Sequence, residues 1–231
     1  MIDTVAIAHF VELAVGTVIA LLPVTNPPAS APAFLALTEH MPPSRRIGQL
    51  RAACGYMVAV LVTFLLAGSL IMRFFGISLP GLRIAGGLMV AGIGSGMLTG
   101  FAEKASGESR DVAAAAGRDI AFSPLAMPML SGPGSIAVTL GLASLAKTWV
   151  DYAAIAVGIV AVAVIAYVIL RLSASVVAFI GTAGMNAITK VMGFLLLCIG
   201  IQFIVNGVLG IATDPAIVRS IRDAAAGSPP R

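Results

Sequence analysis

The sequence predicts an all-α membrane protein with six transmembrane helices, and three observations lead to this fold class. Hydrophobic residues make up 59% of the 231-residue chain and charged residues only 10%, whereas about 25% of the residues of a soluble protein are charged. The hydrophobic residues gather in long runs, several of which reach the roughly 20 residues needed to cross a bilayer. Two of these runs are interrupted by proline and glycine at similar places, which indicates an internal repeat.

The same composition excludes several classes of protein. A soluble domain of this size could not cover its surface with so few charges, so an ordinary soluble enzyme is excluded. The net charge of +4 is a modest surplus of the kind that orients membrane helices, and we expect no nucleic-acid partner. Cys54 and Cys198 lie in apolar runs, and their spacing fits neither a disulfide framework nor a metal site. The lipid bilayer is therefore the partner that the composition itself predicts.

Six apolar runs follow one another along the chain. They cover about residues 6–38, 52–75, 82–101, 120–146, 152–170 and 187–212. The first run is broken at residues 26–28 and the fourth at residues 131–134, where proline cannot continue the hydrogen-bond ladder of a helix. In the third run, Gly92, Gly96 and Gly100 recur at every fourth position, which predicts a helix face that packs closely against another helix.

The two broken runs align with each other at a constant separation. The matched pairs are Pro23 with Pro128, Pro28 with Pro133, Ser30 with Ser135 and Leu35 with Leu140. The third and sixth runs align at a separation two residues longer, which places Gly86 on Gly193 and Gly100 on Gly207. Each half would cross the membrane three times, an odd number, so the second half must enter from the opposite side. The sequence thus predicts two inverted three-helix repeats, with a discontinuous first helix in each.

This repeat divides the chain into four parts. Residues 1–102 form the first predicted three-helix repeat and residues 119–212 the second, inverted one. Residues 103–118 are a polar loop between the repeats, and residues 213–231 are a polar tail whose composition predicts disorder.

The two breaks hold the candidate binding site. Non-helical backbone near the middle of a membrane leaves N–H and C=O groups without partners, so it occurs where it is buried in protein or lines a cavity. The second half of each broken helix would begin there, and its positive N-terminal end favours a carboxylate, while freed carbonyls favour an ammonium or a small cation. The candidate substrate-binding residues are Thr25, Asn26, Pro27, Pro28 and Ser30 in the first break and Leu130, Ser131, Gly132, Pro133, Gly134 and Ser135 in the second. Together they would suit a small zwitterion, whereas the alternative is a pair of structural kinks sealed by neighbouring helices.

Four stretches of the sequence resemble the MarC family of bacterial and archaeal membrane proteins. They are TNPPASAPAFLALT (25–38), RIAGGL (83–88), PLAMPMLSGPGSI (124–136) and GMNAITKVMG (184–193). This family includes transporters of small neutral amino acids, so the resemblance implies transport of a glycine- or alanine-like substrate by a multi-pass protein of the bacterial inner membrane. The first break of the family commonly reads N/D-P-x-G. Here Ala29 and Ser30 follow Pro28, so a glycine of that pattern is missing.

The expected function is that of a secondary transporter that works by alternating access between the two breaks. The coupling ion stays open between H+ and Na+, because no Asp, Glu or His falls in the middle of a run, and the acid–base candidates His9 and Glu12 lie near the outer end of the first helix. No zinc-binding H-E-x-x-H pair or nucleophile with a nearby histidine is present, so we expect neither an enzyme nor a bound metal or organic cofactor. The alternatives are a channel or exporter for another small polar solute and a membrane protein with no transport role. A homo-oligomer is compatible with the sequence.

Overall fold

The computed structural model describes residues 4–99 and 119–213 of the chain. The helices in this part are α1 (Thr4–Thr25), α2 (Pro27–Leu37), α3 (Pro43–Phe74), α4 (Leu79–Thr99), η1 (Ala121–Leu130), α6 (Pro133–Ala143), α7 (Trp149–Arg171) and α8 (Ser173–Ala212). The predicted polar loop at 103–118 and all but the first residue of the predicted tail at 213–231 lie outside the described residues. Every regular element in the described ranges is helical, which confirms the all-α prediction.

Five helices are long and apolar enough to cross a membrane. These spans are Ala6–Thr25, Pro43–Gly68, Leu79–Thr99, Trp149–Arg171 and Ala183–Ala212. The fourth predicted crossing is different, because it consists of the irregular ten-residue η1 and the eleven-residue α6, neither of which reaches the length of a crossing. Residues 4–99 and 119–213 thus contain five helices that can each cross a membrane alone, and the predicted discontinuous fourth crossing consists of two shorter helices.

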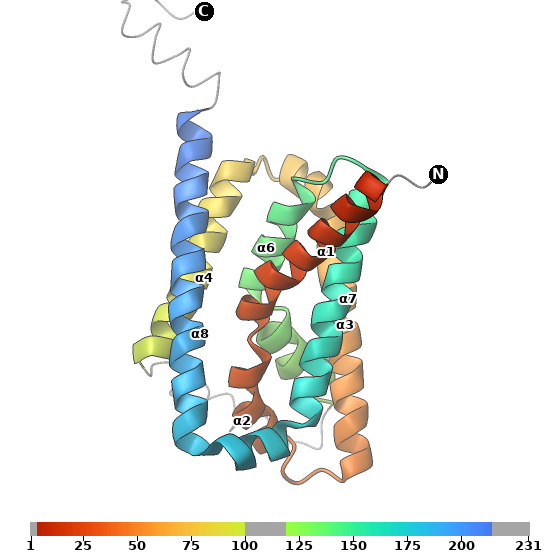
Figure 1. Ribbon diagram of the computed structural model, residues 1–231, viewed down its shortest axis with the longest axis vertical. Helices are drawn as coiled ribbons and strands as arrows, with labels where there is room; N and C mark the ends of the chain where they lie inside the picture. Colours follow the sequence, from red (N-terminus) through yellow and green to blue (C-terminus); the bar gives the residue numbers. More distant parts are fainter. Residues whose placement is uncertain (1–3, 100–118, 214–231) are drawn as a thin grey trace, which may run out of the picture.

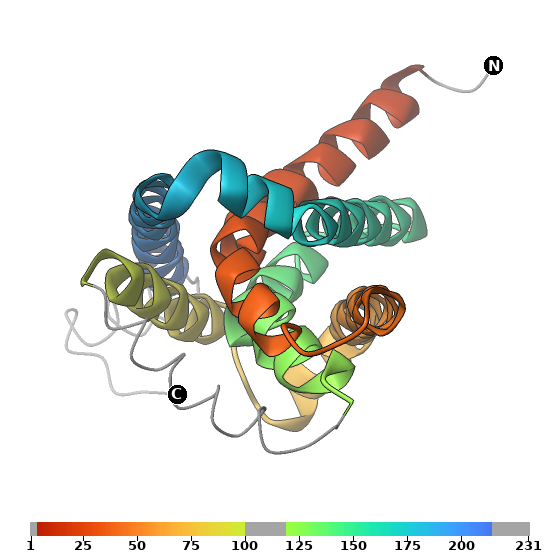
Figure 2. The same ribbon diagram turned by 90° about the horizontal axis from the view of Figure 1, so that it is seen from below.

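The helices form two long pairs with short helices between them. α4 and α8 lie side by side at one edge of the molecule, and α3 and α7 lie side by side at the other, as both views show (Figures 1 and 2). The short helices α2 and α6 lie between the two pairs, and α1 leans across α7. The buried core joins these parts, with Leu21 of α1, Phe34 of α2, Met57 of α3, Leu125 of η1 and Ile159 of α7 all inside it.

Apolar side chains also cover the outside of the long helices. On α1, Ile7, Val11, Val15 and Ile19 recur at every fourth position and are at least half exposed. Residues four apart lie on one face of a helix, so they form a continuous apolar strip. In an integral membrane protein such a strip faces lipid, where exposed hydrocarbon costs nothing.

The closest helix contact is between α4 and α8, and it uses glycines. A Cβ atom on Gly87 would lie 2.5 Å from the carbonyl oxygen of Gly200, and one on Gly94 would lie 2.5 Å from that of Gly193. Only glycine allows two backbones to approach this closely. The predicted ladder is therefore wrong at Gly92 and Gly96, where a Cβ atom would meet nothing within 4 Å, and Gly100 lies outside the described residues. The glycines that make the contact recur every seven residues.

Two helices extend beyond the predicted apolar runs. α3 begins at Pro43, nine residues before the predicted start at 52, since proline is favoured in the first turn of a helix. α8 begins at Ser173 instead of 187 and bends at Gly181, where φ is 72°. The other long helices agree with the predicted runs to within a few residues.

Candidate functional site

The first break is a single residue, Asn26, in the left-handed region with φ 38° and ψ 61°. Asparagine tolerates this conformation better than most residues. Its N–H donates to the carbonyl of Leu22 at 3.0 Å, and its carbonyl accepts the N–H and the hydroxyl of Ser30, both at 3.3 Å. Ser30 thus occupies both acceptor positions of this carbonyl, so it is not one of the freed carbonyls that we expect at the breaks.

The side chain of Asn26 is the unsatisfied group at this break. It is 5% exposed, and its Nδ2 donates to the sulfur of Met97 in α4 at 3.6 Å, a weak acceptor. Its Oδ1 is buried and accepts no hydrogen bond from the described residues. An unpaired buried acceptor costs about 1–3 kcal/mol, so Oδ1 is suited to accept a hydrogen bond from an ammonium or a hydroxyl, or to contact a small cation.

The second break is built differently. The backbone hydrogen bonds of η1 span five residues, so the N–H of Ser131 donates to the carbonyl of Ala126 at 2.8 Å. The Ser131 hydroxyl donates to the same oxygen at 2.7 Å. Gly132 then adopts an extended conformation, and α6 begins at Pro133. Ser131 is fully buried. Its hydroxyl proton is already used inside the protein, which leaves only its lone pairs for a ligand.

Gly134 brings the two breaks together. A Cβ atom on Gly134 would lie 3.0 Å from Cγ1 of Val24 in α1 and 3.1 Å from Cγ2 of Val90 in α4. Val24 precedes Asn26 by two residues, and Met97, which contacts Asn26, lies two turns along α4 from Val90. α4 therefore flanks both breaks, and the absence of a side chain at Gly134 is what allows the second break to approach the first.

Most of the predicted site residues are buried at the two breaks. Thr25, Asn26, Pro27, Leu130, Ser131, Gly134 and Ser135 are buried, whereas Pro28, Ser30 and Gly132 are half-buried. Pro133 is exposed, so it starts α6 without facing the interior. The Thr25 hydroxyl donates to the carbonyl of Leu22 at 3.2 Å, within its own helix.

Sequence reasoning missed the residues of α4 that close the site. Met97, Val90 and, from α1, Val24 contact the breaks, but they carry no polar group and follow no motif. Nothing in their position along the chain separates them from the other apolar residues of their helices. Only the arrangement of the helices identifies them.

Comparison with known proteins places the chain in a family. Residues 11–212 match the family model described as MarC family integral membrane protein. A relative from Salmonella typhimurium, named UPF0056 inner membrane protein MarC, is 41% identical over 213 residues, which cover 87% of this chain and 96% of the relative. Relatives of the same name from Citrobacter koseri and Escherichia coli are each 40% identical at the same coverage. No solved structure matches. The chain belongs to the MarC family of integral membrane proteins, and its relatives are proteins of the inner membrane.

Proposed function

We propose that this protein is a secondary transporter of small neutral amino acids, such as glycine or alanine, that works by alternating access at the two breaks. The substrate class follows from the resemblance of the breaks to those of small-neutral-amino-acid transporters. The place of the site follows from one observation: Asn26 Oδ1 is a buried acceptor without a partner among the described residues. A buried polar atom of this kind is expensive, and a ligand that donates a hydrogen bond would offset the cost.

The two ends of a zwitterion would find complementary groups here. The ammonium would donate to Asn26 Oδ1 and to the lone pairs of Ser131. The carboxylate would lie near the N-terminal ends of α2 and α6, where the helix dipole favours an anion. A substrate with a large side chain would not fit next to Gly134, since Val24 and Val90 are already in contact with its backbone.

The way in which the helices pack supports two inverted repeats, residues 1–102 and 119–212, as the moving parts. α1 and α2 contact α7, and α2 contacts α8; in the same way η1 and α6 contact α3, and α6 contacts α4. If the two halves are exchanged, η1 takes the place of α1, α6 that of α2, α7 that of α3 and α8 that of α4. Each contact of the first half then becomes the corresponding contact of the second half, and the α3–α7 and α4–α8 pairs stay unchanged. Such an exchange is typical of transporters in which one repeat rocks against the other.

The coupling ion in this proposal is H+ or Na+. No Asp, Glu or His lies on the turns next to either break, so a proton carrier would have to act from a distance. Sodium binds to oxygen atoms, and Asn26 Oδ1 and Ser131 Oγ are two buried oxygen atoms at the breaks. No other cofactor is proposed.

Uptake into proteoliposomes tests the proposal. The matched variants are Asn26→Gly, which removes Oδ1 but keeps the left-handed conformation, and Thr63→Ala, which removes an exposed hydroxyl on α3. We expect saturable uptake of labelled glycine or alanine by the wild type and by Thr63→Ala, and its loss in Asn26→Gly. Saturable uptake that survives in Asn26→Gly would contradict the site. Unsaturable flux would favour a channel, and no flux with a Na+ or pH gradient would favour a different solute or no transport role.

A further inference from the structure

A groove runs along the outside of the molecule between α3 and α7. Its volume is about 320 Å³. On the α3 side it is lined by Arg51, Gly55 and Val58, and on the α7 side by Val160, Val164 and Tyr167. Both valines of α7 are about half exposed. The groove is therefore apolar along most of its length and polar at the end where Arg51 and Tyr167 lie.

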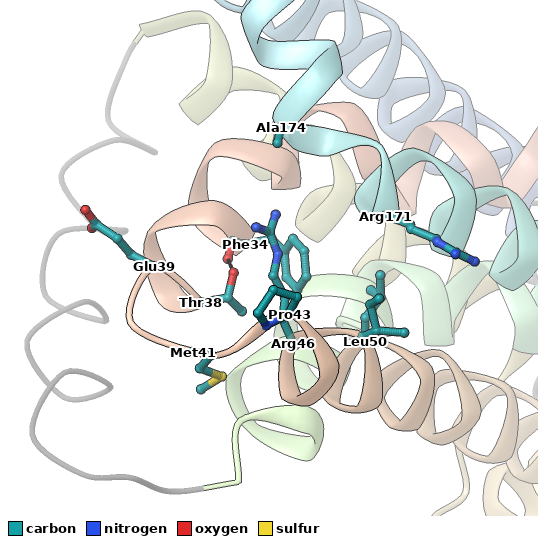
Figure 3. A pocket seen from close by; sticks show the side chains of 10 residues that line it. Phe34, Thr38, Glu39, Met41, Pro43, Arg46, Leu50, Arg171 and Ala174 are labelled. Carbon is teal, nitrogen blue, oxygen red and sulfur yellow. Dashed lines mark hydrogen bonds between the residues drawn. The ribbon is translucent and has the colours of Figure 1, made fainter.

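A second hollow adjoins the polar end of this groove. It has a volume of about 270 Å³ and lies between the end of α2, the start of α3 and the end of α7 (Figure 3). Arg46 and Arg171 both line it, and the one acidic residue in its described lining is Glu39. Arg46 is held in place, because its Nη2 donates to Ser173 Oγ at 3.2 Å and its guanidinium lies 5.0 Å from the centre of the Phe34 ring.

Arg171 joins the two hollows. Its side chain extends away from Arg46 (Figure 3), and its guanidinium lies 5.9 Å from the centre of the Tyr167 ring, with Nη1 3.5 Å from the Tyr167 hydroxyl. Tyr167 lines the groove, so Arg171 and Arg51, from two different helices, lie toward the same end of it, and Arg46 lies in the adjoining hollow. Guanidinium groups bind phosphate through paired hydrogen bonds.

The groove and Arg171, which lies one turn beyond it on α7, together span about one leaflet of a bilayer. From Arg171 back to Val160, α7 rises by about 16 Å at 1.5 Å per residue. Half of the hydrocarbon core is about 15 Å thick. An acyl chain that lies in the groove would thus reach from the arginines to the middle of the membrane. Arg51 lies about one and a half turns after Arg46 along α3, and its side chain is long enough to extend to the level of the headgroups.

We propose that the α3–α7 groove is a binding site for an anionic phospholipid, with an acyl chain along Gly55, Val58, Val160 and Val164 and the phosphate held by Arg51 and Arg171. The cluster of positive charge selects a lipid with net negative charge over a zwitterionic one, and the apolar groove selects a lipid over a free phosphate ester. The site is independent of the proposed transport function.

A lipid titration of the detergent-purified full-length protein tests the charge selection. Dioleoylphosphatidylglycerol should raise the melting temperature to saturation and remain bound in native mass spectra, whereas dioleoylphosphatidylcholine and glycerol 3-phosphate should do neither. Replacing Arg51 and Arg171 by Gln should weaken the apparent affinity by about fivefold for each arginine. The matched control is Arg73→Gln, because Arg73 lies in the last turn of α3 as Arg171 lies in the last turn of α7. Equal stabilisation by phosphatidylcholine, or unchanged affinity in the double variant, would overturn the proposal.

Filling the groove tests the acyl-chain part of the site separately. A Cβ atom on Gly55 would have no atom within 4 Å, so Gly55→Leu should occupy the groove without displacing its neighbours. We expect the melting temperature without lipid to stay unchanged and the stabilisation by phosphatidylglycerol to be lost. Gly92→Leu on α4, where the space is equally open, should keep that stabilisation. Unchanged phosphatidylglycerol binding in Gly55→Leu, or equal affinity for glycerol 3-phosphate, would mean that the arginines bind an anion and no lipid.

Discussion

The two breaks occupy matching places in the sequence, but they differ in how their polar groups are satisfied. The first break follows a 22-residue helix that can cross a membrane by itself, and it leaves Asn26 Oδ1 buried without a partner among the described residues. The second lies between two short helices and directs the Ser131 hydroxyl to the carbonyl of Ala126. A buried donor that already has its bond stabilises the fold, whereas a buried acceptor without one is suited to a ligand. Equal spacing of proline around two breaks therefore does not imply equal chemistry.

The largest expected effect concerns ligand binding at the first break. A saturating amino acid, at 100 times its dissociation constant, should stabilise the wild type by about 2.7 kcal/mol. Asn26→Gly should abolish this stabilisation, because the ligand loses its acceptor. Ser131→Ala should weaken the affinity for the amino acid by about tenfold at most, since the hydroxyl proton of Ser131 already bonds within the protein. Thermal unfolding in detergent with glycine and alanine measures both. Equal losses in the two variants would contradict the difference between the breaks.

A second prediction concerns the contact that holds the breaks together. Gly134→Val would place methyl groups against Val24 and Val90, which leave about 3 Å for a Cβ atom, and overpacking of this kind costs about 1–3 kcal/mol. The melting temperature should fall and uptake should be lost with it. Gly141→Val on the same helix, where a Cβ atom meets nothing within 4 Å, should change both far less. If Gly134→Val kept full uptake, the two breaks would not act as one site.

The positions of both breaks could be predicted from the sequence, and the reason is local. Proline lacks the N–H that continues a helix, and in Asn26-Pro27-Pro28 and Ser131-Gly132-Pro133 it follows a residue that readily leaves helical torsions, whereas Pro23 and Pro32 lie inside α1 and α2. The apolar runs likewise predicted most of the helices, because hydrocarbon requires about 20 apolar residues for a crossing. Local chemistry was thus enough to place the candidate site along the chain.

Features that depend on contacts between helices could not be predicted. Gly87, Gly92 and Gly94 are all glycines of the apolar helix α4. Only the position of α8 decides which of them lie at the α4–α8 contact. The start of α8 at Ser173 was missed because Gly181, Gly184 and Asn186 interrupt the apolar pattern, whereas the helix continues on both sides of the bend at Gly181. The unpaired Asn26 Oδ1 was missed because it depends on where the side chain points.

A third prediction gives the two breaks opposite effects on stability in the absence of ligand. Ser131→Ala removes a 2.7 Å hydrogen bond, while the Ala126 carbonyl keeps the N–H of Ser131, so the loss should be about 1 kcal/mol. Asn26→Gly removes an unpaired buried acceptor, so stability should stay equal or rise. Denaturation of the two purified variants without substrate compares them directly. A loss of stability in Asn26→Gly as large as that in Ser131→Ala would mean that Oδ1 has a partner in the ligand-free protein.

The smallest expected effect is that of Ser30→Ala, and it tests whether the left-handed conformation of Asn26 is held by its backbone. The Ser30 hydroxyl donates to the Asn26 carbonyl at 3.3 Å, near the long limit for an O–H···O bond, and the N–H of the same residue keeps bonding to that carbonyl in the variant. The loss of stability should therefore stay below about 0.5 kcal/mol, at the low end for a single hydrogen bond. Uptake by proteoliposomes should remain near that of the wild type. A severe loss of uptake with unchanged stability would instead place the Ser30 hydroxyl on the substrate, and the first break would then offer a donor as well as the Asn26 acceptor.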